Sequence, residues 1–204
     1  MSLRVGGQCL VIGGIGSIVS TLLVFLIPGP DGITGPGSIP ADVLMILSGV
    51  LLLIGLPTMY RAQARQVGRL GLVGVALLMG AIVLGWLVLS GIELHDVAVP
   101  GAIPRSGPDG PPPLALISAA LAELCFLIGG LIVGIKTIRA QVFPAVAGWV
   151  VLITSALLIP TTIAGNANRM LDVIFMSSDI ALLCAGLAWA GATFSLQRET
   201  PQVA

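Results

Sequence analysis

Six long apolar runs constrain this chain more than any other feature. Each can cross the roughly 30 Å of hydrocarbon in a bilayer, which takes about 20 helical residues. The runs lie at about Val5–Ile27, Ala41–Tyr60, Leu70–Ile92, Leu114–Ile135, Phe143–Ile163 and Leu171–Leu196. Because hydrocarbon offers no water to an open backbone, such runs predict helices. We therefore expect an all-α integral membrane bundle of six transmembrane helices, in which residues 1–204 form a single transmembrane domain.

The composition agrees with a chain surrounded by lipid. Only 9% of the residues are charged, against about a quarter in a typical soluble domain. The formal net charge is zero, so no basic excess points to a nucleic-acid partner. Cys9, Cys125 and Cys184 each lie inside an apolar run without a CxxC spacing. This pattern predicts buried thiols and neither a disulfide nor a zinc site.

The basic residues predict the orientation in the membrane. Seven of the nine fall on one side of the predicted spans, in the N-terminus, the second and fourth connectors and the tail: Arg4, Arg61, Arg65, Arg69, Lys136, Arg139 and Arg198. Only Arg105 and Arg169 fall on the other side. Cytoplasmic connectors carry the excess of lysine and arginine. We therefore expect a multi-pass protein of the cytoplasmic membrane with both termini inside.

Two acidic residues lie within the predicted hydrocarbon interior. Glu123 is nine residues into the fourth run, roughly 14 Å deep, and Asp179 is eight residues into the sixth, roughly 12 Å deep, at 1.5 Å per residue. A charged carboxylate at this depth costs several kcal/mol and usually marks a functional group. Desolvation favours the neutral form, so at least one of the two should be protonated at pH 7.

The helical faces around these acids favour contact with protein. Glu123 shares its face with small residues, including Gly130 and Gly134, whose GxxxG spacing lets helix backbones approach closely. Ser48 and Ser155 fall at a similar depth on the second and fifth runs. We therefore expect a polar layer in the outer half of the bundle. Its candidate ligand-binding residues are Ser48, Glu123, Ser155 and Asp179.

Two other patterns have simpler interpretations. The ELHD sequence, residues 93–96, groups three possible metal ligands on a predicted solvated loop. A single histidine without a second cluster favours a polar loop start over a metal site, so we predict no metal and no cofactor. Trp86 falls towards the outer membrane interface, where tryptophans often form a belt.

One stretch resembles a broad class of known sequences. In GGLIVGIKTIRAQVFPAVAGWVVLITSALLI, Gly129–Ile159, a helix ends in the basic residues Lys136 and Arg139. Phe143 and Pro144 then lead into a helix bearing Gly148 and Trp149. This pattern is similar to uncharacterised bacterial multi-helix integral membrane proteins. The resemblance implies a helical membrane topology and a bacterial origin, and no activity.

Three functions fit these features. The first is a non-enzymatic binding or accessory protein, whose partners are the lipid bilayer and either other membrane subunits or a lipophilic small molecule. The second is a proton-coupled carrier of a small or lipophilic solute. The third is an intramembrane acid–base enzyme for a lipid-soluble, isoprenoid-like substrate. The last two would use Glu123 and Asp179. The sequence favours the first function, and whether the chain is an enzyme stays open.

Overall fold

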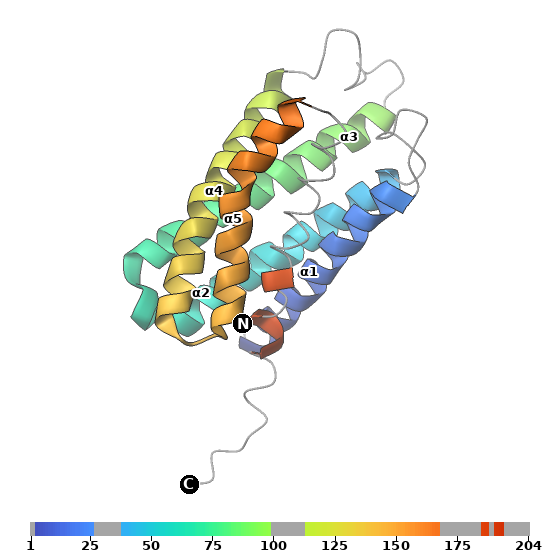
Figure 1. The fold of residues 1–204 in the computed structure, drawn as a ribbon. Helices are drawn as coiled ribbons and strands as arrows, with labels where there is room; N and C mark the ends of the chain where they lie inside the picture. Colours follow the sequence, from blue (N-terminus) through green and yellow to red (C-terminus); the bar gives the residue numbers. More distant parts are fainter. Residues whose placement is uncertain (1–2, 27–37, 99–112, 168–184, 188–189, 194–204) are drawn as a thin grey trace.

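The computed structural model describes residues 3–26, 38–98, 113–167, 185–187 and 190–193 (Figure 1). The elements are α1 (Leu3–Leu26), α2 (Ser38–Ile82), the π-helical segment η1 (Val83–Val88), α3 (Leu89–Ala98), α4 (Pro113–Ala140) and α5 (Ala145–Ala167). No strand occurs in this part of the chain. The all-α prediction is confirmed for the described residues.

In the part of the chain that the structure describes, three helices are long and apolar enough to cross a membrane. They cover Arg4–Leu23, Ile39–Ile92 and Pro113–Ala140, and a shorter apolar helix follows at Ala145–Leu158. Large apolar side chains remain exposed along their outer faces, among them Ile12, Leu47, Leu116 and Ile153. An apolar outer surface of this extent suits a protein embedded in lipid, where water imposes no cost on it.

Helix α2 is a hairpin of two antiparallel arms. Gly68 has φ 61° and ψ −160°, a left-handed conformation that glycine adopts readily because it lacks a Cβ. Beyond this residue the chain runs back along itself. A Cβ added at Gly49 in the first arm would lie 3.3 Å from Ile82 and 3.5 Å from Trp86 in the second. The sequence predicted a loop from residue 61 to 69, but alanine, glutamine and arginine favour helix, so the reversal is confined to Gly68.

The second arm continues beyond the predicted end at Ile92. It passes through the π-helical turns of η1 and then through α3 to Ala98. The ELHD residues, which were expected on a loop, therefore lie on the helical backbone of α3. Within this helix His95 is exposed, and the side chains of Glu93 and Asp96 lie outside the described residues.

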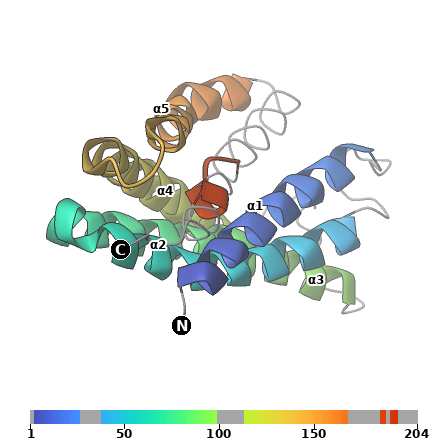
Figure 2. The same cartoon turned by 90° about the horizontal axis from the view of Figure 1, so that it is seen from below.

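The elements follow one another around the bundle. Helix α1 contacts α2, α2 contacts α4, and α4 contacts α5. Short helical pieces near the C-terminus complete the arrangement between α1 and α5 (Figure 2). A Cβ added at Gly191 would lie 2.9 Å from Leu10 on α1, and one at Gly186 would lie 3.1 Å from Val150 on α5. The rest of the predicted span Leu171–Leu196 lies outside the described residues.

Most of the described basic residues lie at one end of the bundle. Gly6, near the start of α1, contacts Thr58 near the end of the first arm of α2. Gln63 Nε2 donates a hydrogen bond of 3.4 Å to Thr137 Oγ1 near the end of α4. This end carries Arg4, Arg61, Arg65, Arg69, Lys136 and Arg139. The fold thus groups the six described residues among the seven that the sequence assigns to one side of the membrane.

Candidate functional site

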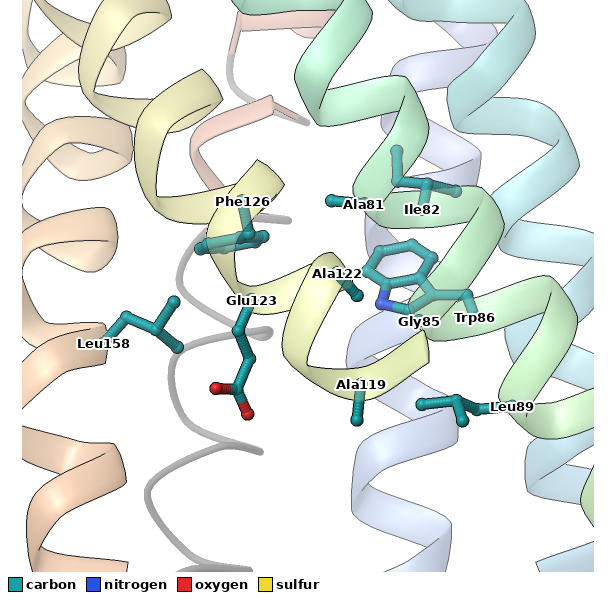
Figure 3. Close-up of a pocket in the computed structure, with 10 residues that line it drawn as sticks. All are labelled: Ala81, Ile82, Gly85, Trp86, Leu89, Ala119, Ala122, Glu123, Phe126 and Leu158. Carbon is teal, nitrogen blue, oxygen red and sulfur yellow. The ribbon is translucent and has the colours of Figure 1, made fainter. Parts of the chain in front are cut away.

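A cavity of about 130 Å³ lies among α2, η1, α3, α4 and α5 (Figure 3). Its described lining consists of Ala81, Ile82, Gly85, Trp86, Leu89, Ala119, Ala122, Glu123, Phe126 and Leu158. Apart from Glu123, these residues are apolar or glycine. The cavity is similar in size to an engineered apolar cavity of about 150 Å³ that binds benzene. It can therefore accept an apolar group the size of one ring.

Helix α4 contributes Glu123 and three neighbours to one wall. Ala119, Ala122 and Phe126 stand at spacings of four, one and three from Glu123, which places all four on one side of the helix. The carboxyl group turns away from Phe126 and lies near the level of Ala119 (Figure 3). The lining thus combines aromatic side chains with one acid that is turned away from Phe126. The prediction that Glu123 faces other helices agrees with its half-buried position.

The opposite wall is built on the π-helical segment. Gly85 and Trp86 belong to η1, and Ile82 and Leu89 flank it. A π-helix hydrogen-bonds residue i to i+5 and is frequent at functional sites. Its wider turn brings Gly85 and Trp86 to the cavity together with residues from the α-helical turns on either side. The pattern of apolar residues does not predict this segment.

Trp86 points into the protein, which corrects the prediction of a membrane-interface residue. It is 7% exposed, and its ring lies beside Ala122 of α4 (Figure 3). Gly49 faces the indole, since a Cβ added there would lie at an ordinary van der Waals distance of 3.5 Å from its ring. Gly85 and Ala122 also keep η1 close to α4. In the sequence, the small residue next to Trp86 is the feature that could have indicated that its side chain points into the protein.

Beyond the cavity, α4 packs closely against both neighbours. A Cβ added at Gly129 would lie 2.9 Å from the Gly74 carbonyl oxygen on α2. One added at Gly134 would lie 2.9 Å from the Leu152 backbone nitrogen on α5. Gly130 contacts Ser155 on α5. The GxxxG spacing therefore marks a close helix contact, as predicted.

The two candidate serines lie at helix contacts away from the cavity lining. Ser48 is 2% exposed and contacts Gly13 and Gly16 of α1. Ser155 is fully buried, and its hydroxyl donates a 2.8 Å hydrogen bond to the Val151 carbonyl of its own helix. Such hydroxyls permit close helix approach while satisfying their own polar atoms. A role for either serine in ligand binding stays a prediction.

The remaining site candidates are only partly covered by the structure. Asp179 lies outside the described residues. Cys9 and Cys125 are half-buried free thiols. Within residues 3–26, 38–98, 113–167 and the short C-terminal pieces, no group of three or more histidine, cysteine, aspartate or glutamate side chains could hold a metal.

Comparison with known proteins returned no matching family model, no similar curated protein and no similar solved structure. The geometry around Glu123 is therefore the basis for assigning a function.

Proposed function

We propose that this chain is a membrane protein that binds a small lipophilic molecule in the cavity beside Glu123, without catalysing a reaction. The observation that carries the proposal is the cavity itself. It is walled by aliphatic and aromatic side chains, and it has one acidic residue on its lining in the described part of the chain. Small-molecule sites combine a mainly apolar surface with a few polar groups that fix the orientation.

The location of the cavity among apolar helices means that a ligand could reach it from the lipid. It lies among helices that are apolar enough to cross a membrane. A molecule dissolved in the lipid could enter it without crossing an aqueous surface. A ring-sized ligand that moves from the lipid into the cavity would gain dispersion contacts with Trp86 and Phe126.

The described lining favours binding over chemistry. Acid–base catalysis on a lipophilic substrate needs one group to donate a proton and another to accept it or stabilise charge. Glu123 is the only residue on the described lining that exchanges a proton readily. The proton-coupled carrier and the acid–base enzyme both require a contribution from Asp179, and they stay alternatives on that condition.

A direct test uses Trp86 as the reporter. The chain has three tryptophans, so the double variant Trp149→Phe/Trp189→Phe leaves Trp86 as the only one. In lipid nanodiscs, iodobenzene should quench its fluorescence with a saturating dependence on the concentration in the bilayer. Heavy-atom quenching needs close contact, so saturation reports occupancy of a site beside the indole.

Filling the cavity supplies the matched comparison. Ala122→Leu places a larger side chain on the lining and should abolish the saturating component. Ala76→Leu makes the same chemical change on an exposed position of α2 and should preserve it. Linear, unsaturating quenching that is the same in both variants would refute a binding site in this cavity.

We also propose the complete topology of six spans, with both termini on the cytoplasmic side of a bacterial membrane. The grouping of basic residues at one end of the bundle supports this orientation. In whole cells, Arg65→Cys should be protected from a membrane-impermeant maleimide. Ser106→Cys, in the third predicted connector, should be labelled. Labelling of residue 65 from outside would reverse the proposed orientation.

A further inference from the structure

We propose that the ligand of the Glu123 cavity is a small lipophilic amine, with a body of about one ring and a positively charged head. This inference rests on the proposed binding function and adds the chemical class of the ligand. It follows from the size of the cavity, from the distribution of its lining side chains and from the position of Glu123, which has the only carboxyl group on the described lining.

The size limits the body of the ligand. A volume of about 130 Å³ is slightly below that of the apolar cavity that accommodates benzene. One aromatic ring or a short branched alkyl group fits as a whole within this volume, whereas a long acyl or polyprenyl chain could place only its end there. The cavity therefore suits a compact ligand better than an ordinary membrane lipid.

The lining places the body and the head in different parts of the cavity. Trp86, Ile82 and Phe126 provide an apolar surface for the body. The carboxyl group of Glu123 is turned away from Phe126 and lies near the level of Ala119 (Figure 3). A ligand with its ring against these apolar groups can direct a polar substituent towards the acid.

The acid selects the charge of that substituent. Ionisable groups within a membrane are stabilised by pairing with a group of the opposite charge. An ammonium head supplies this charge together with up to three hydrogen-bond donors. An anionic head would be repelled, and a neutral hydroxyl would offer one donor and no charge. A carboxylate has about four acceptor sites, which allows one to bond to the protein and to a ligand at the same time.

The experiment compares two ligands of nearly the same shape. In the protein whose only tryptophan is Trp86, quenching is titrated with 3-iodobenzylamine and with 3-iodobenzyl alcohol, each expressed as a mole fraction in the bilayer. The amine should bind about tenfold more tightly or better, because hydrogen bonds to charged groups are stronger than those between neutral groups. Both ligands should give saturating curves.

Two variants test the role of the acid. Glu123→Gln keeps the size of the side chain and removes its charge, so it should erase the preference for the amine while the alcohol still binds. Asp42→Asn makes the same change at a carboxyl group outside the described lining, and should retain the preference.

The outcomes separate the two proposals. Equal affinities in the parent protein, or a preference that survives Glu123→Gln, would overturn the amine inference and leave an apolar binding site. Failure of both ligands and of iodobenzene to give saturation would overturn the binding function as well. A preference lost only on Glu123→Gln would support both.

Discussion

The two halves of α4 contain similar small residues, but one half makes a close helix contact and the other lines a cavity. From Gly129 to Gly134 the glycines bring the backbone of α4 against the backbones of α2 and α5. From Ala119 to Phe126 the alanines leave a cavity opposite η1. Small residues therefore do not by themselves specify a tight contact. The structure opposite each half decides whether a contact or a cavity forms. The glycine half faces neighbouring backbone, and the alanine half faces a widened helical turn that carries Gly85 and Trp86.

The strongest test of this comparison is Gly134→Ala. The added methyl would lie 2.9 Å from the Leu152 nitrogen and 3.0 Å from the Gly148 carbonyl oxygen. Both atoms belong to the backbone of α5 and cannot move without separating α4 from α5. We expect the free energy of unfolding to fall by about 2–3 kcal/mol, near the upper range for overpacking. Titration of the protein in mixed micelles with a denaturing detergent measures this value, and an unchanged midpoint would disprove the tight contact.

Gly130→Ala should have an intermediate effect. The new methyl would overlap the hydroxyl of Ser155, which can rotate away, and would lie 2.9 Å from the Ser155 Cβ, which cannot. We expect a loss of about 1–2 kcal/mol in the same unfolding titration. Ser155→Ala alone should cost little, because the hydroxyl bonds within its own helix. Combined with Gly130→Ala it should recover about 0.5–1 kcal/mol, and strict additivity of the two changes would contradict their contact.

Glu123→Gln, in the half of α4 that lines the cavity, should change the free energy of unfolding of the protein by no more than about 1 kcal/mol. The amide keeps the shape of the side chain and can still donate or accept a hydrogen bond, while a net bond contributes only about 0.5–1.5 kcal/mol. The detergent titration, compared with the parent protein, checks the value. Loss of folded protein in the membrane after this single change would mean that the acid is essential to the packing of the bundle.

Gly85→Ala should have the smallest effect. Its methyl would lie 3.4 Å from the Ala122 methyl, an ordinary van der Waals distance at the wall of the cavity. We expect a change within about 0.5 kcal/mol, since the better helix propensity of alanine offsets slight crowding. The difference between this substitution and Gly134→Ala is the sharpest measure of the contrast. Equal losses for both would show that the cavity side is packed as tightly as the glycine side.

The helices and the close glycine contact could be predicted from the sequence because both depend on local patterns. Apolar length marks the spans, and the spacing of Gly130 and Gly134 marks a face that approaches another helix. The reversal at Gly68 was harder to locate, since the residues before it favour helix and the turn needs only one glycine. Helix ends are set by such single-residue geometry and by tertiary contacts.

The cavity could be predicted only in part. The position of Glu123 within an apolar run marked it as a candidate, and it does line the cavity. Its neighbours across the cavity depend on which helices stand side by side, which span positions do not encode. Depth alone grouped Ser48 and Ser155 with Glu123, but depth ignores rotation about the helix axis, and both serines point to other helix contacts. The direction of Trp86 depends on η1, for which the periodicity of apolar residues gave no signal.

The π-helical segment also indicates how a helix of this chain can accommodate a change in length. A single residue advances an α-helix by 100°, so one residue inserted into a regular α-helix would rotate everything on one side of the insertion relative to the other. In the present chain the wider turns of η1 absorb that extra residue while the α-helices on both sides keep their own contacts. Insertions of one residue are ordinarily confined to loops; here the equivalent of one is accommodated in the middle of a helix, beside the cavity.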